Sequence, residues 1–321
     1  MASPNRAVWR TPEIEDPTNR YLIHPISWAL VRVLSRTRVH PNLVSLAGLG
    51  SGLGAAFALS QYEQGGWLWL GAGLLFLWHV FDGADGQLAR LTGRSSELGK
   101  ILDGLCDHGT FAALYVSLAW ASAPSWGSWA FLLAASAALS HFVQANAYEL
   151  QRQLYDYWVH GKATSPLEHP AQLWARRAAF RGVGRWLVLP YYVYLRLQKL
   201  AGRVQEPLLE HLRSLREPSE QERARMLYRA YQAPMVRIWG ALSSNYRTAA
   251  LLLACGSGEP VGFFLWELTI LNGLLLGLLV AQWRRNQTLL RQLRAEPARA
   301  PHVNRWALAA IRSFCYPKRR R

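Results

Sequence analysis

The sequence predicts an all-α integral membrane protein, and three observations lead to that prediction. Apolar and aromatic residues make up 51% of the 321 residues, which include 15 Trp. They gather into runs of about 20 residues or more, and a helix of that length crosses the hydrocarbon core of a bilayer. The three cysteines are too few and too scattered for a disulfide framework or a thiolate metal site. We expect six transmembrane helices, an N-terminal interfacial amphipathic helix and a cytoplasmic insert.

Residues 1–41 form an N-terminal segment that we place in the cytosol and at the membrane surface. The segment has no compact apolar core, so no cleavable signal peptide is expected. Between Tyr21 and Leu34, apolar residues share one helical face near Arg32 and Arg36: Leu22, Ile23, Ile26, Leu30, Val33 and Leu34. This pattern predicts an amphipathic helix lying along the bilayer, although a soluble core helix would look similar.

Residues 42–150 contain the first four predicted spans, at about 42–60, 67–91, 96–120 and 128–148. Asn42, after His40 and Pro41, is the expected N-cap of the first span. Gly93 breaks the chain between the second and third spans, and Ser95 or Ser96 is expected to cap the third.

Residues 151–231 form the predicted cytoplasmic insert. The stretch from Trp186 to Leu195 is apolar but only about half a bilayer long, so we predict an interfacial or re-entrant segment there. Leu208, Leu209, Leu212 and Leu215 mark an amphipathic helix. Ser219-x-x-Glu222 is typical of a capping box that opens the next helix.

Residues 232–283 hold the fifth and sixth predicted spans, at about 234–254 and 261–283, and residues 284–321 form a basic tail. The connections 61–66, 123–127 and 255–260 contain no Lys or Arg. Because Lys and Arg accumulate on the cytoplasmic side, both termini and the insert are predicted to be cytoplasmic. The formal net charge of +16 would suit a nucleic-acid-binding protein, but a basic membrane-protein surface explains it, and no nucleic-acid partner is expected.

Four carboxylates interrupt the second and third spans, and each pair follows one stripe of a helix. The stripes hold Asp82, Asp85, Gly86 and Ala89 in the first helix and Gly99, Asp103 and Asp107 in the second. An antiparallel hairpin would bring all four carboxylates to a common depth, about 9–17 Å below the break. Ionised groups inside a membrane are costly and usually functional. We predict a site for hard divalent cations that opens to the cytoplasm; a proton or ion pathway in a transporter is the alternative.

The stretch Asp82-x2-Asp85-Gly86-x2-Ala89-Arg90-x8-Gly99-x3-Asp103-x3-Asp107 resembles the motif of the CDP-alcohol phosphotransferase family at all eight fixed positions. The resemblance covers these two helices directly. It implies an enzyme that uses Mg²⁺ or Mn²⁺, expected as two ions, and releases CMP from a CDP-linked donor. It also implies Asp82, Asp85 and Asp103 as metal ligands and Asp107 as the general base, with a metal contact of Asp107 left open.

The same resemblance implies donor contacts with the nucleotide or diphosphate from Asp82, Gly86, Ala89, Arg90 and Gly99. The guanidinium of Arg90 suits bidentate phosphate binding, with snorkelling to the headgroups as the alternative.

Three further residues are candidates for an acceptor pocket: Arg237, Asn245 and Arg247. Arg247 and Glu267 lie at similar predicted depths, so they could instead form a buried ion pair. His141, Gln144 and Asn146 in the fourth span are expected to form hydrogen bonds between helices.

The resemblance implies phospholipid synthesis by a homodimer, expected in a bacterial inner membrane. We favour CDP-diacylglycerol as donor and a small acceptor such as inositol phosphate, glycerol phosphate or serine. The alternative is a CDP-linked small alcohol such as CDP-choline, with diacylglycerol or a ceramide-like lipid as acceptor. A UbiA-like prenyltransferase would need a second acidic motif, and none follows Asp107. A cation-coupled transporter is the distant alternative.

Overall fold

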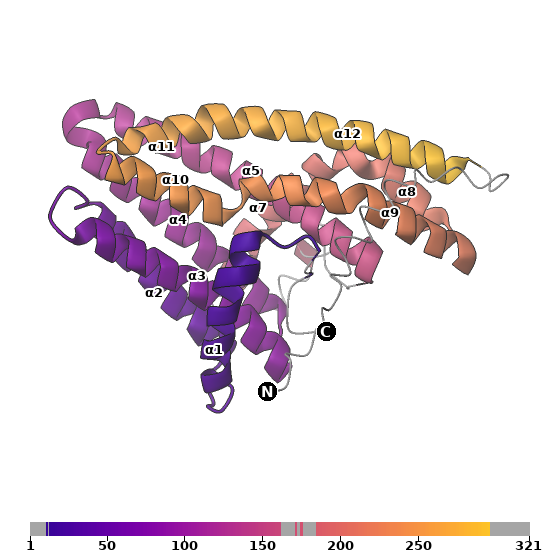
Figure 1. The fold of residues 1–321 in the computed structure, drawn as a ribbon, viewed down its shortest axis with the longest axis horizontal. Helices are drawn as coiled ribbons and strands as arrows, with labels where there is room; N and C mark the ends of the chain where they lie inside the picture. The colour runs from indigo at the N-terminus through magenta and orange to yellow at the C-terminus, as the bar shows by residue number, and fades with distance from the viewer. Residues whose placement is uncertain (1–10, 12, 162–170, 172–173, 176–183, 296–321) are drawn as a thin grey trace, which may run out of the picture.

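The computed structural model describes residues 11, 13–161, 171, 174–175 and 184–295. Every regular element in that part of the chain is helical, so the all-α prediction is confirmed. In Figure 1, α12 runs along the upper side of the molecule, and α2 and α3 lie side by side at one end.

A π-helical turn, η2 (Asn19–Ile23), leads into α1 (His24–Leu34), which packs against α3 (Trp67–Thr92). The buried residues of α1 are His24, Ser27 and Val31, and the Ser27 hydroxyl donates to the Val80 carbonyl at 2.9 Å. Leu22 and Val33, two of the apolar residues predicted to share one face toward the bilayer, are 46% and 63% exposed, whereas Ile23 of the same predicted face is buried. The helix is therefore where the sequence indicated. Its location at the membrane surface stays a prediction.

Three helices, α2 (Pro41–Leu59), α3 and α4 (Glu97–Trp126), pack together and match the first three predicted spans closely. The predicted cap at Asn42 is wrong: His40 is the N-cap, and its Nδ1 accepts a hydrogen bond from the Asn42 backbone at 3.2 Å. Pro41 occupies the first turn, where its missing N–H costs nothing.

The fourth predicted span lies within a longer helix. Helix α5 (Trp129–His160) continues about three turns past Tyr148 and ends where Gly161 takes a positive φ of 62°. No proline or glycine interrupts residues 149–160, and Arg152 pairs with Glu149 at 2.8 Å. The helix is about 48 Å long, which exceeds a hydrocarbon core of about 30 Å.

The described part of the insert is mostly helical. It comprises the end of α5, then α7 (Gly184–Gly202), η4 (Arg203–Gln205), α8 (Glu206–Ser214) and the start of α9 (Pro218–Trp239). The predicted amphipathic helix is confirmed in α8, which buries Leu208, Leu209 and Leu212. The predicted capping box is wrong, because α9 begins at Pro218, ahead of Ser219, with Glu217 as a cap that makes no side-chain hydrogen bond. Trp186–Leu195 lies within α7, which packs against α4 and α5; its relation to the membrane stays a prediction.

The fifth predicted span is not one helix. Helix α9 ends at Trp239, η5 (Gly240–Leu242) follows, and Ser243 is extended before α10 (Ser244–Gly256) begins. The Arg247 guanidinium donates to the Leu242 carbonyl at this break. A buried side chain thus satisfies an acceptor that the interruption frees, which the local sequence did not indicate.

The last helical run consists of α11 (Pro260–Trp266), the π-helical η6 (Glu267–Leu271) and α12 (Asn272–Arg294). Within the described residues, four stretches are long and apolar enough to cross a bilayer: Pro41–Leu59, Trp67–Thr92, Trp129–His160 and Pro260–Arg294. They indicate a multi-pass membrane protein. Helices α4 and α10 are not among them, and α10 has only 13 residues. The count of six spans stays a prediction.

A buried ion pair joins α10 to the last helical run, as the sequence suggested. The Arg247 Nε donates to the Glu267 Oε1 at 2.8 Å, and both side chains are fully buried. The Tyr115 hydroxyl donates to the same oxygen at 3.0 Å, and the Arg247 Nη2 donates to the Gln144 Oε1 at 2.5 Å. The predicted interhelical roles of Gln144, of His141 near Tyr115, and of Asn146, which donates to the Tyr194 carbonyl at 3.1 Å, are confirmed.

Replacement of Arg247 by Met should destabilise the protein by about 3–5 kcal/mol, because it leaves the Glu267 carboxylate buried without its cation. The double variant R247M/E267M should regain most of that loss, since it removes both charges. Thermal unfolding of the purified protein measures both effects. R225M is the matched control, because its partner Glu222 is 58% exposed and the pair lies at the surface. Equal losses in R247M and R225M would contradict this account.

Candidate active site

A tight reversal between α3 and α4 sets the position of the acidic motif. Gly93, the predicted breaker, ends α3 with a positive φ of 65°, and the Arg94 N–H donates to the Ala89 carbonyl at 3.0 Å. Ser96 caps α4, because its hydroxyl accepts from the Gly99 N–H at 3.0 Å. Of the two predicted caps, Ser96 is the correct one. The two helices leave the reversal antiparallel, so the acids of each approach those of the other.

The four motif carboxylates line one small hollow, which is partly open. Oxygens of Asp82, Asp85 and Asp103 all lie within 4.8 Å of one another, and Asp107 joins them on the wall. Asp85 is buried, with 4% of its surface exposed. Hard oxygen donors at this spacing suit Mg²⁺ or Mn²⁺, which bind through a few carboxylates and complete their shell with water or phosphate oxygens. The donor set therefore fits the metal that the resemblance implies.

Helix α2 contributes to this hollow, which the sequence reasoning missed. The Ser45 hydroxyl donates to the Asp85 Oδ2, and Ser45 and Gly48 line the wall together with Trp78 and Cys106. A hydroxyl at this place orients the carboxylate, in the way that outer partners orient metal ligands. The signal was present, because Ser45, Gly48 and Gly52 form a stripe of small residues on an otherwise apolar helix.

Close packing of α2 against α3 and α4 makes that contact possible. A Cβ added at Gly48 would lie 3.2 Å from the Phe81 Cβ, and one added at Gly52 would lie 2.4 Å from the Thr110 side chain. The backbone of α2 thus approaches both motif helices more closely than a larger residue would allow.

The predicted donor-binding residues lie near the reversal, on the same two helices. The Arg90 Nη1 lies 3.2 Å from the place that a Cβ on Gly86 would occupy, so the guanidinium folds back along the Asp82 stripe. A Cβ added at Gly99 would lie 3.3 Å from the Asn42 Oδ1, which brings the start of α2 to the same end of the site. Ala89 is partly buried, and Arg90 is exposed.

The three acceptor-pocket candidates do not line the hollow. Arg237 donates from Nε to the Glu13 carbonyl at 2.6 Å, and Asn245 donates from Nδ2 to the Asn19 Oδ1 at 2.9 Å. Both hold the N-terminal segment. Arg247 belongs to the buried ion pair, and no contact described here supports a pocket role for it.

Glu13 anchors the N-terminal segment to α5 and α9. Its carboxylate accepts from the Tyr155 hydroxyl at 2.6 Å and from the Arg229 Nε at 2.9 Å, and the His160 Nε2 lies 2.9 Å away. Burial raises the pKa of Glu13, but the hydrogen bonds from Tyr155, Arg229 and His160 outweigh it, so the pKa lies below the ordinary 4.5.

The protein is a helical membrane bundle. Carboxylates from two neighbouring helices, α3 and α4, meet at one hollow in it. Residues 38–179 match the CDP-alcohol phosphatidyltransferase family, and this part of the chain is a CDP-alcohol phosphatidyltransferase domain. The resemblance that the motif indicated is confirmed, and the family is one of transferases.

Several curated proteins are similar to about a third of the chain. Phosphatidylinositol phosphate synthase of Mycobacteroides abscessus is 31% identical over 105 residues, which cover 33% of this chain and 46% of that protein. The synthase of Cutibacterium acnes is 35% identical over 99 residues, 30% of this chain and 44% of that protein. Ethanolaminephosphotransferase 1 of Pongo abelii is 28% identical over 116 residues, 32% of this chain and 29% of that protein. The chain spans less than half the length of the relatives it matches.

The contact between α2 and α4 should tolerate no added methyl group at Gly52. G52A should destabilise the protein by about 1–3 kcal/mol, because the new Cβ overlaps Thr110. T110A in the same chain should restore only part of the loss, since it removes the two atoms at 2.4 Å and leaves the Cβ at 2.9 Å. Thermal unfolding measures the effect. G50A is the matched control, since an added Cβ there meets nothing within 4 Å. Destabilisation by G50A to the same extent would argue against a local clash.

Attachment of the N-terminal segment should depend on pH. Because the pKa of Glu13 in the folded protein lies below 4.5, its contribution to stability is present above pH 4.5 and is lost as the pH falls through the folded value. At pH 7, E13Q should raise hydrogen exchange of residues 13–20 about tenfold, the loss expected for a charge-assisted hydrogen bond. E210Q, an exposed change in α8, is the control. Unchanged exchange in E13Q would show that Glu13 does not hold the segment.

Proposed function

We propose that this protein is a membrane phosphotransferase that moves a phosphatidyl or other substituted phosphoryl group from a CDP-linked donor to an acceptor hydroxyl. The observation that carries the proposal is the convergence of Asp82, Asp85, Asp103 and Asp107 on one hollow within a domain of this family. We propose a multi-pass protein of phospholipid synthesis whose motif reversal and termini face the cytoplasm.

The chain's own groups have distinct parts in the proposed reaction. Asp107 accepts the proton of the acceptor hydroxyl, whose oxygen forms a bond to the phosphorus distal to cytidine. The bond between that phosphorus and the bridging oxygen breaks on the opposite side, and CMP leaves with the bridging oxygen. Arg90 binds phosphate oxygens, and the small surfaces of Gly86, Ala89 and Gly99 let the nucleotide approach the helix backbones.

Asp82, Asp85 and Asp103 would hold the divalent ions, expected as two Mg²⁺ or Mn²⁺, with Asp107 as a further possible ligand. When bound, such ions neutralise charge on the diphosphate and on the departing CMP. Ser45 keeps the Asp85 carboxylate oriented toward the hollow through its hydrogen bond.

We propose that some segments of the chain lie in the membrane and that others lie outside it. We propose that residues 42–150 and 232–283 form the membrane part, with residues 151–231 as a cytoplasmic insert. Residues 1–41 and 284–321 then flank it as a cytosolic or interfacial segment and a basic tail. A homodimer is proposed from the family resemblance alone.

CDP-diacylglycerol is the donor that we favour, with a small hydroxylated acceptor such as inositol phosphate, glycerol phosphate or serine. Similarity to the phosphatidylinositol phosphate synthases supports this choice. The second candidate is a CDP-linked small alcohol donor with a lipid hydroxyl acceptor, and the similarity to ethanolaminephosphotransferase 1 supports it.

A CMP-release assay on the purified protein tests the proposal and separates the two candidates. The donors are CDP-diacylglycerol, CDP-choline and CDP-ethanolamine, each combined with inositol phosphate, glycerol phosphate, serine or diacylglycerol. We expect turnover with CDP-diacylglycerol and one small acceptor, and its loss when EDTA removes divalent ions. Absence of CMP from every pair, with Mg²⁺ or Mn²⁺ present, would refute the proposal.

In the same assay, D107N should lower turnover at least about a hundredfold, the scale of a lost general base. The variant should remain folded and still bind the CDP donor, because the other three acids and Arg90 are intact. E220Q, an exposed change in α9, is the control. Full activity of D107N would remove Asp107 from the proposed role.

A further inference from the structure

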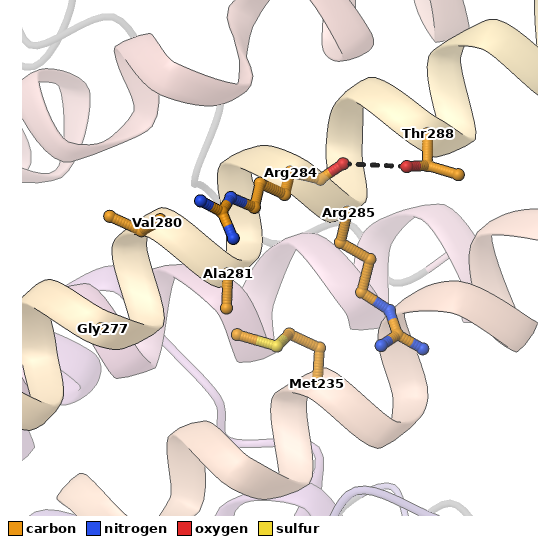
Figure 2. A pocket seen from close by; sticks show the side chains of 7 residues that line it. All are labelled: Met235, Gly277, Val280, Ala281, Arg284, Arg285 and Thr288. Carbon is orange, nitrogen blue, oxygen red and sulfur yellow. Dashed lines mark hydrogen bonds between the residues drawn. The ribbon is translucent and has the colours of Figure 1, made fainter.

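A groove on the side of the molecule lies between α9 and α12, away from the acidic hollow. It has a volume of about 440 Å³, and its wall includes Met235 of α9 and Gly277, Ala281 and Arg284 of α12 (Figure 2). Met235 is buried and forms the floor, whereas the α12 residues are exposed. An added Cβ at Gly277 would meet nothing within 4 Å, so the groove is open at that position.

The groove lies where a cytoplasmic membrane interface is expected. Counted from Pro260 at the start of the last helical run, Gly277 is about 26 Å and Arg284 about 36 Å along the axis. A hydrocarbon core of about 30 Å therefore ends between these two residues. The apolar half of the groove faces acyl chains, and its basic half faces headgroups.

Exposed apolar residues beside the groove indicate that lipid, rather than water, covers this face. Leu276, Val280 and Trp283 of α12 are 64%, 49% and 49% exposed, and Ile238 of α9 is 53% exposed. In a membrane, the lipid hydrocarbon that surrounds such apolar residues is more favourable for them than water.

Two arginines give the groove its charge. Arg285 is fixed by α9, because its Nε donates to the Tyr231 carbonyl and its guanidinium lies 5.7 Å from the Tyr231 ring centre. Arg284 is exposed and turns back along α12 toward Val280 (Figure 2). Within the described part of the chain neither arginine forms an ion pair, so both charges are available to an anion.

We propose that this groove binds one anionic phospholipid of the cytoplasmic leaflet. Its phosphodiester lies against Arg284 and Arg285, and one acyl chain follows the open surface of Gly277 and Ala281. A second copy of this chain is disfavoured as the occupant, because a symmetric pair of α12 helices would bring two Arg284 side chains together. The site lies outside residues 38–179 and goes beyond the proposed transfer reaction.

Lipid retention by the purified full-length protein tests this proposal without any assay of turnover. The protein is equilibrated in micelles with equal amounts of phosphatidylglycerol and phosphatidylcholine of the same acyl composition, and native mass spectrometry counts the retained lipids. The wild-type protein should retain phosphatidylglycerol preferentially. R284Q should lower that retention about tenfold, the effect of one lost charge-assisted hydrogen bond. G277L should lower retention of both lipids, because its side chain fills the open groove.

R291Q is the matched control, since it removes an exposed arginine from the last turn of the same helix outside the groove. It should retain phosphatidylglycerol as the wild type does. The proposal is wrong if R284Q and R291Q behave alike, or if inorganic phosphate alone displaces the lipid. It is also wrong if G277L leaves lipid retention unchanged but converts dimers into monomers, because a second copy would then cover the groove.

Discussion

The cost of keeping charge inside an apolar helical bundle constrains the whole structure. A carboxylate at membrane depth is stable only when other groups, or bound cations, replace its water. The bundle meets this requirement in two ways. Glu267 is neutralised by Arg247 and by hydrogen bonds, and it is fully buried. The motif acids instead surround a hollow that is partly open, so cations and a phosphorylated substrate can supply the missing partners.

A contact between α10 and α3 connects the helices that carry these two charged sites. The Arg247 guanidinium holds the break between α9 and α10, and α10 reaches α3 where Thr248 lies 2.9 Å from His79. His79 is one turn from Asp82 on α3. The ion pair therefore braces the helix that carries the first two acids, although it takes no part in the proposed chemistry.

Much of this arrangement could be read from the sequence because it depends on local signals. Gly93 and Ser96 marked the ends of α3 and α4, and the spacing of the acids placed them on facing stripes. The break at Ser243 could not be read, because it depends on Arg247, a contact made within the fold. Ser45 was missed for a different reason: the stripe of small residues on α2 was visible, but the Asp85 carboxylate that Ser45 contacts is identified only when the helices are packed.

The acceptor-pocket candidates show a further limit of that approach. Arg237 and Asn245 do not line the hollow; they hold the segment around Glu13 and Asn19. Polarity and depth indicate where a side chain lies along a helix, not which neighbour it contacts. A segment more than 200 residues earlier in the chain supplied that neighbour, and no local pattern could have indicated it.

The short reversal at residues 93–96 also sets the rotation of the two motif helices about their own axes. An insertion between Ser96 and Asp103 would rotate every later residue of α4 by about 100° and turn its acids away from α3. The motif has a fixed count of eight residues between Arg90 and Gly99, and these residues include the reversal. Homologous chains should therefore keep the length of the reversal as well as the spacing of the acids.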